Sequence, residues 1–509
     1  MRKQLRLTVL IFGQLLLLAG CLPQEIREDF VLTEDVIYIS GDKVRLTGRV
    51  VVANGDITDH GFYLSENEDF TSPTTISLGA KENGLGRFIA DYSGLKIGTQ
   101  YYYKSYAIIG GKEITGKTEQ FASLQPAIKY FTPAFGDGGT KVTIVGNNFT
   151  EGTQVFFGDT EASIESLNDE SVIVAIAPPL GANPDVTIRV VVQDTSMTFA
   201  DIYQYPYGVW QLETTFIDNT QLYETAFLRI NNEFVFGLGK EYGSFDLNLK
   251  MWSLDLTNYS WTQLNFPGFQ GTTSPFVTAT YWGAGKEETT FSGSSFSPYF
   301  WQYQGNDTFE LLPFLPFRLY KATAHETNDY IYIIGGLLPG GNDNYNPIVY
   351  RYDKSSKSWI VSGSFTPEST MPISSDLPYF TYNNNAYFVM PIVGQQGGYE
   401  IWQYDLETND FNFFNELPFS GTLDGGIAIV KNDKVYIGLF TNYIDLYELD
   451  LLTGSWTVKK GFAGSSKDVN IGYFTYNDKI FVMRSKYQGG RFDPDPKMEL
   501  WSFDPDKIK

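Results

Sequence analysis

Short runs of alternating apolar and polar residues recur along most of the chain, separated by turn-forming residues. Clear examples are RLTGRVVV (45–52), VTIVGNNF (142–149) and VTIRVVV (186–192). A period of two predicts β-strands with one face turned toward a core, and Gly, Asn and Asp between them favour turns. Beyond the N-terminus no stretch keeps a helical period with capping residues at its ends. The pattern predicts an all-β protein.

From about residue 206 to the end, the chain repeats itself with a period near 50 residues. Each unit has an apolar strand after an Asn/Asp turn, then a phrase in which an aromatic follows an aspartate by six residues. The phrases MWSLDLTNYSW (251–261), VYRYDKSSKSW (349–359), IWQYDLETNDF (401–411) and LYELDLLTGSW (446–456) are the clearest copies. FWQYQGNDTF (300–309) is a degenerate copy, and LWSFDPDKIK (500–509) is the sixth. A repeat of this length is typical of a propeller or a solenoid.

The run YIYIIGGLL (330–338), with its double glycine, together with VYRYDKSSKSW resembles a kelch repeat. The other units lack the double glycine, so residues 206–509 resemble a divergent kelch-like β-propeller with six blades. The aromatic that should follow Asp504 would lie past Lys509, and Trp210 in YGVWQLETT (207–215) has no phrase of its own. In propellers of this family the first strand often completes the last blade. We therefore expect 208–213 to pair with 499–504, which would close the ring and remove an exposed sheet edge.

Two further β-modules are predicted before the propeller. In residues 32–123, the segment GLKIGTQYYYKSYA (94–107) resembles fibronectin type III modules, which implies that Leu95, Tyr101 and Tyr103 face a sandwich core after a turn at Gly98. Residues 126–205 resemble the IPT/TIG immunoglobulin-like domain. The matching residues are Pro133, Gly138, Gly139, Thr140, Val142, Ile144, Gly146, Asn148, Phe149, Val155, Phe157 and Gly158. The expected fold is two immunoglobulin-like sandwiches followed by the propeller, an arrangement that says little about function.

The N-terminus carries a secretory pattern. MRKQLR is basic, LTVLIFGQLLLLAG is a short apolar core, and Leu18-Ala19-Gly20-Cys21 resembles a bacterial lipobox. The resemblance implies cleavage of residues 1–20, lipidation of Cys21 and a tether over 21–31, with an ordinary secretory signal as the alternative. Acidic residues just downstream resemble the surface-export signal of Bacteroidota lipoproteins. We expect an outer-membrane, lipid-anchored protein on the cell surface.

The charge of the chain bears on its binding partners, and its cysteine content bears on disulfide bonds. The chain has 37 Lys and Arg against 59 Asp and Glu, a net charge of −22. A negative charge of this size repels nucleic acid, so no nucleic-acid partner is expected. Cys21 is the only cysteine, which leaves none for disulfides once it carries lipid.

The predicted site lies where long connections leave the propeller. With strands A to D counted outward from the axis, the A–B turns are tight, whereas the B–C segments are long and irregular. Aromatics and arginine on such loops favour ligand or partner binding, although they also pack against neighbouring loops. The candidate ligand-binding residues are Tyr242, Phe245, Tyr345, Tyr399, Tyr487 and Arg491.

Catalytic chemistry is sparse in this sequence. The only histidines are His60 and His325, and His325 is expected at an A–B turn in a structural role. A histidine-rich metal site and a Ser-His-Asp triad have too few residues, and no phosphate-binding glycine loop is present. GNDNYN (341–346) lacks the ordered carboxylate spacing of a calcium loop. The one catalytic possibility that stays open is a pair of Asp or Glu carboxylates, as a glycosidase uses. We expect a non-enzymatic protein without cofactor or metal.

Two functions remain open. In the first, the propeller captures glycans beside an outer-membrane uptake system. In the second, it docks a protein, as a subunit of an envelope complex or as an adhesin. The sequence gives residue types at the rim but not their directions, so it does not choose between the two.

Overall fold

The computed structural model describes residues 28–82, 84–218, 220–242, 246–268, 270–287, 295–339, 344–364, 373–392, 397–421, 423–485 and 497–508. Within these ranges every regular element is a strand, so the predicted all-β class is confirmed. No helix in the described part of the chain is long and apolar enough to cross a membrane. The chain forms two compact units, one ending near Tyr203 and the other containing residues 204–509.

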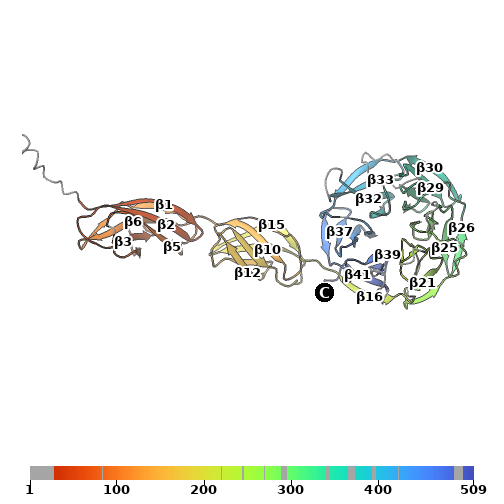
Figure 1. Cartoon of the computed structure of the whole chain (residues 1–509), viewed down its shortest axis with the longest axis horizontal. Coiled ribbons are helices and arrows are strands. Elements are labelled where there is room, and N and C mark those ends of the chain that lie inside the picture. Colours follow the sequence, from red (N-terminus) through yellow and green to blue (C-terminus); the bar gives the residue numbers. More distant parts are fainter. Residues whose placement is uncertain are drawn as a thin grey trace, which may run out of the picture. The chain divides into compact units, whose positions relative to one another are not determined.

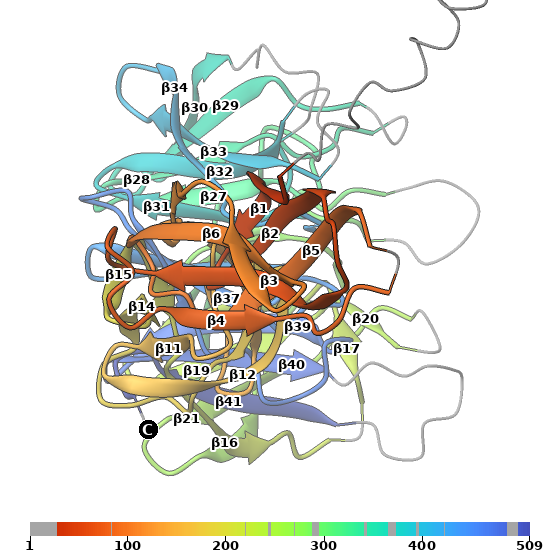
Figure 2. The same ribbon diagram turned by 90° about the vertical axis from the view of Figure 1, so that its left-hand side faces the viewer.

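The first module of unit one is a two-layer sandwich. One layer has the order β1 (Phe30–Ser40), β2 (Lys43–Val52), β5 (Gly86–Ser93), and Figure 2 shows these strands side by side. The other has the order β4 (Thr74–Ser77), β3 (Ile57–Ser65), β6 (Gln100–Ile109), β7 (Lys112–Thr115), with β8 (Glu119–Ala122) on β6. Leu95, Tyr101 and Tyr103 are all buried in the core between them, as predicted. The tyrosine row therefore serves packing.

The second module contains a sheet of seven strands. Its order is β15 (Thr195–Gln204), β14 (Asp185–Val192), β11 (Gln154–Phe157), β12 (Thr160–Asn168), β13 (Val172–Ile176), β10 (Lys141–Asn147), β9 (Ala127–Thr132). Val142 and Ile144 alternate into the core with Phe149. Gly146 permits this packing, because a Cβ there would lie 2.3 Å from the Phe149 ring and 2.2 Å from the Ala127 carbonyl oxygen.

Unit two is a six-bladed propeller, and its blades surround a central axis (Figure 1). Blades one to three consist of β18 (Ala226–Ile230), β19 (Glu233–Gly237), β21 (Met251–Asp255), β22 (Ser260–Gln263); β23 (Phe276–Val277), β24 (Tyr281–Gly283), β25 (Phe300–Gly305), β26 (Thr308–Leu311); and β27 (Thr323–Glu326), β28 (Tyr330–Ile334), β29 (Ile348–Asp353), β30 (Ser358–Ser364). Blades four and five consist of β31 (Tyr379–Tyr382), β32 (Asn385–Pro391), β33 (Tyr399–Asp405), β34 (Phe411–Glu416); and β35 (Ile427–Lys431), β36 (Lys434–Gly438), β37 (Leu446–Asp450), β38 (Trp456–Lys459). A small extra sheet pairs β17 (Leu222–Tyr223) with β20 (Lys240–Glu241).

Blade six is split between the two ends of the propeller. It consists of β39 (Val469–Tyr476), β40 (Lys479–Ser485), β41 (Met498–Asp504) and, outermost, β16 (Val209–Thr215). Trp210 pairs with Phe503, and its ring also packs against Phe462. The indole N–H of Trp210 donates to the carbonyl oxygen of Lys460 at 2.9 Å. The predicted closure is confirmed, and β16 extends two residues further than expected.

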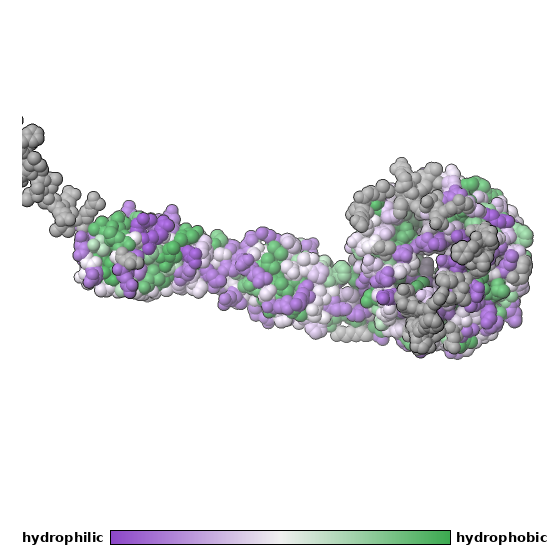
Figure 3. All heavy atoms as spheres, viewed as in Figure 1, coloured by the Kyte–Doolittle hydropathy of each residue, from purple (hydrophilic) through white to green (hydrophobic). Residues whose placement is uncertain are grey.

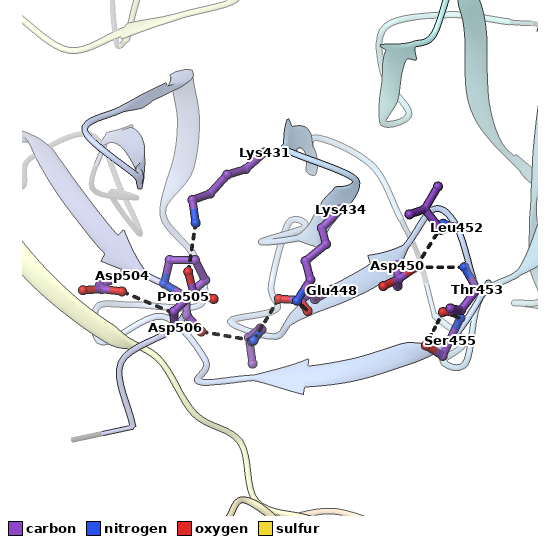
Figure 4. Close-up of polar contacts among 11 residues, drawn as sticks. Lys431, Lys434, Glu448, Asp450, Leu452, Thr453, Ser455, Asp504, Pro505 and Asp506 are labelled. Atoms are coloured by element: carbon purple, nitrogen blue, oxygen red, sulfur yellow. Dashed lines mark hydrogen bonds and ion pairs between the residues drawn. The ribbon is translucent and has the colours of Figure 1, made fainter.

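The repeated aspartate of each phrase caps the turn between strands C and D. A carboxylate oxygen of Asp405 accepts hydrogen bonds from the backbone N–H groups of Glu407 and Thr408 at 2.8 and 2.9 Å. Asp450 repeats this with Leu452 and Thr453 at 3.0 and 2.8 Å (Figure 4). These bonds stabilise the ionised carboxylate and lower its pKa. The motif recurs because each turn leaves N–H groups that need an acceptor.

Buried charge also ties blade five to the closing segment. Glu448 in β37 pairs with Lys434 (Figure 4). It also pairs with Lys459, whose ammonium lies 2.8 Å from the Glu448 carboxylate. Lys459 also donates to the carbonyl oxygen of Pro505 at 3.0 Å and lies 3.6 Å from the centre of the Tyr207 ring. The cluster therefore joins blade five to the first and last segments of the propeller.

Candidate functional site

The central channel of the propeller opens into a cavity of about 310 Å³ at the end where the B–C and D–A connections lie. Residues from all six blades line it, because each blade contributes the segment at the start of its innermost strand. They include Tyr223, Glu224, Thr225, Phe227, Ser274, Val277, Lys321, Asp376, Tyr379, Gly425, Asn470 and Tyr473. We call this cavity the channel mouth. It is concave and rests on a rigid scaffold, the setting in which ligand sites are usual.

Hydrogen bonds from blade to blade hold the channel mouth together. Ser274 N–H donates to the Glu224 carbonyl oxygen at 3.0 Å, and Lys321 N–H donates to that of Ser274 at 3.1 Å. Ser375 N–H donates to Lys321, and Gly425 N–H donates to Asp376, both at 2.9 Å.

The last two links of this ring use side chains. The amide nitrogen of Asn470 donates to the Gly425 carbonyl oxygen at 2.7 Å, and the Thr225 hydroxyl donates to that of Ile471 at 2.8 Å. The ring is continuous around the axis, so the lining groups are fixed in position.

Charged groups at the channel mouth form compensated pairs. Lys321 Nζ lies 2.8 Å from Asp376, and Lys240 Nζ lies 3.6 Å from Glu224. Burial by itself raises the pKa of Glu224, but the Thr273 hydroxyl and the ammonium of Lys240 outweigh it, so the pKa falls below its usual value. For Lys321, burial lowers the pKa while the bond to Asp376 raises it, and the net direction is upward. Glu224 and Lys321 are therefore ionised at neutral pH.

Further along the axis, the channel continues into a second cavity of about 360 Å³. The two cavities share Phe227, Val277, Tyr379 and Tyr473. Burial raises the pKa of Tyr379 to about 12 and also raises that of Tyr473. Both phenols therefore stay neutral donors at the boundary between the cavities.

One predicted site residue lies beside the channel mouth. Tyr242 is 45% exposed, and its ring makes an edge contact with that of Tyr223, with centroids 6.4 Å apart. Tyr223 lines the cavity, and the ammonium of Lys240 lies 5.8 Å from its ring centre. Blade one thus presents two adjacent aromatic rings at this edge.

The other predicted residues have different surroundings. Tyr345 is half-buried against an apolar cluster of Phe296, Tyr320 and Leu337. Tyr399 is the first residue of β33, half-buried, and its hydroxyl accepts the N–H of Leu423 at 3.3 Å. A ligand role for either one stays a prediction. The remaining predicted residues, Phe245, Tyr487, Arg491 and the lipidation site Cys21, lie outside the described residues.

His325 corrects one expectation from the sequence. It lies in the innermost strand β27, not at an A–B turn, and it is fully buried. Its ring nitrogens lie 3.0 Å from the Thr381 hydroxyl and 3.1 Å from the Thr323 hydroxyl. Burial lowers the pKa of His325 to about 3, so it packs between blades three and four as a neutral ring.

Sequence reasoning missed the polar lining of the channel mouth. Its key positions hold Glu224, Ser274, Lys321, Asp376 and Asn470, which share a place in the repeat but no residue type. Their only common signal is that each comes shortly before, or at the start of, an innermost strand. The described residues contain no group of acidic, histidine or cysteine side chains arranged to hold a metal ion.

Comparison with known proteins identifies one module. Residues 126–207 match the IPT/TIG domain, which confirms the prediction for that segment. No curated protein matches the chain. Among solved structures, a protein of unknown function from Bacteroides thetaiotaomicron is similar at 13% identity and a TM-score of 0.38, over 74% of this chain and 98% of its own. The structure of YjhT is similar at 13% identity and a TM-score of 0.42, over 55% of this chain and 94% of its own.

Proposed function

We propose that this protein is a non-enzymatic lipoprotein of the outer membrane, attached through Cys21, whose propeller captures glycans at the cell surface beside an uptake system. The channel mouth supports this proposal. It places the ring of Tyr223 beside carboxylates, hydroxyls and an amide in one concave site. Sugars are bound by this combination, in which an aromatic face covers the C–H groups and polar groups bond to the hydroxyls.

Glycan binding is tested on an array with the soluble protein, residues 22–509. Tyr242→Ala removes the exposed ring beside Tyr223 and is expected to weaken binding by at least fivefold. Tyr130→Ala is the matched control, because Tyr130 is similarly exposed, at 54%, but lies in the second sandwich. A control that weakens binding as much as Tyr242→Ala contradicts a site on the propeller.

The lipid attachment is tested separately in cells. Labelling with a palmitate analogue is expected to mark the wild-type protein, and Cys21→Ser is expected to abolish the label and release the protein from membranes. An unchanged label on the variant contradicts attachment through Cys21.

Protein docking is the second candidate, and exposed apolar side chains on outer strands favour it. Val361 in β30 is 64% exposed and Phe413 in β34 is 55% exposed. On the face shown in Figure 3, hydrophilic and hydrophobic residues are intermixed. If the protein binds no glycan on the array, protein docking becomes the favoured function. The partner is then sought by pull-down from solubilised envelopes.

A further inference from the structure

The channel mouth has no uncompensated charge among its described lining residues. Lys321 is paired with Asp376 at 2.8 Å, and Glu224 with Lys240 at 3.6 Å. No arginine is among the described residues that line the cavity, so none of them offers a guanidinium that could bind a carboxylate in bidentate fashion. An anionic ligand would face Glu224 and Asp376 without a free cation among the described lining residues, in a protein that carries a net charge of −22.

One acceptor in the lining, the side-chain oxygen of Asn470, has no hydrogen-bond donor. Asn470 donates both amide hydrogens, to the carbonyl oxygens of Gly425 and Leu439 at 2.7 and 2.8 Å. Its own oxygen is buried and has no donor. A buried acceptor without a donor is costly, so a ligand that brings a hydroxyl group there is favoured.

The shape of the cavity limits how a glycan enters. Because all six blades line the channel mouth, it is closed on every side at the level of the ring of hydrogen bonds. A polysaccharide chain cannot pass through it from side to side. Only the end of a chain, or a branch one sugar long, fits into the cavity.

From these observations we propose that the channel mouth binds an uncharged terminal sugar residue and discriminates against sugars that carry a carboxylate. This inference rests on the proposed glycan capture and names the class of sugar. The sugar's hydroxyls donate to Asn470 and Glu224, while its carbon face packs against Tyr223. The charge pairs leave a carboxylate without a partner.

The test uses pairs of immobilised oligosaccharides that differ only at carbon six of the terminal residue. One member ends in glucose, galactose or mannose, and the other in the corresponding uronic acid. The wild-type protein is expected to bind at least one neutral member, and its uronic counterpart at least tenfold more weakly.

Asp376→Asn makes the test specific for the channel mouth. It removes the partner of Lys321, leaves the site with one net positive charge, and is expected to reduce the discrimination at least fivefold. The Asp376 side chain is 48% exposed, so the variant should fold, which tryptophan fluorescence verifies. Asp201→Asn is the matched control, since it makes the same charge change at an exposed position in β15.

The outcomes separate the two proposals. If no glycan of either class binds, glycan capture itself is wrong. If uronic members bind as well as neutral ones, glycan capture stands and the inference is overturned. The inference is equally overturned if Asp376→Asn and Asp201→Asn leave the same discrimination as the wild type, because the site then lies elsewhere.

Discussion

Lys459→Met should destabilise the contacts that close the propeller ring. The Lys459 side chain has no exposed surface, and its ammonium contacts Glu448 at 2.8 Å and the Pro505 carbonyl oxygen at 3.0 Å. Methionine keeps most of the apolar stem but removes the charge. Glu448, which is itself buried, then keeps only Lys434 as a cationic partner.

The expected loss follows from the burial of this pair. Removing one partner of a buried ion pair typically costs about 3–5 kcal/mol, because the other charge stays behind without compensation. Since Lys434 still faces Glu448, we expect about 3 kcal/mol, at the lower end of that range. Lys431→Met is the matched control. Lys431 binds the same closing segment through Asp506 at 2.9 Å (Figure 4), but the Asp506 side chain is exposed, so the loss should be below about 1 kcal/mol.

Urea denaturation followed by tryptophan fluorescence measures this effect. All nine tryptophans lie between Trp210 and Trp501, so the signal reports the propeller and not the two sandwiches. With a slope of about 3 kcal/mol per molar urea, the midpoint of Lys459→Met should fall by about 1 M.

Two results test the reasoning further. Adding Glu448→Gln to Lys459→Met should restore part of the lost stability, because the unpaired charge is gone. If Lys459→Met and Lys431→Met shift the midpoint equally, burial does not set the strength of this closure and the reasoning is refuted.

Three further predictions concern the blades. His325 has a pKa of about 3 in the folded protein and near 6.5 when unfolded, so between these two pH values the unfolded state binds more protons. The free energy of unfolding should therefore fall on acidification by about 1.4 kcal/mol per pH unit from this group. His325→Gln should remove that slope in a series of denaturation curves from pH 7 to pH 4.5. Asp405→Ala removes the acceptor of a C–D turn and should lower the free energy of unfolding by about 1 kcal/mol, which urea titration detects; no change would mean that solvent replaces the carboxylate. Trp210→Ala removes the half-buried ring that packs on Phe503 and Phe462, and it should lower the free energy of unfolding by about 2 kcal/mol. Circular dichroism should show a lower thermal midpoint; an unchanged midpoint would show that β16 does not support the closure.

Much of the fold was predictable because it depends on local patterns. The period of two identified strands such as β10, and the aspartate phrases identified blades, since each turn needs the same acceptor. Trp210 was assigned to the last blade by counting phrases, and β16 confirms that assignment.

The candidate site was predicted only in part. Tyr242 lies beside the channel mouth, whereas Tyr345 and Tyr399, with similar loop signals, are half-buried against neighbours; a ligand role for each of the three stays a prediction. Glu224 and Asn470 carry no motif at all. They are brought together only because each precedes or begins an innermost strand on the same axis.

The strand content, the number of repeats and the split last blade were all evident from the sequence, because each depends on residues close together in the chain or on a fixed spacing. The tertiary structure alone decided which side chains meet around the axis. Packing the blades around the axis brings Asn470 of blade six beside Gly425 of blade five, and Asp376 of blade four beside Lys321 of blade three. Such contacts depend on the direction of side chains from different blades, which no local pattern encodes.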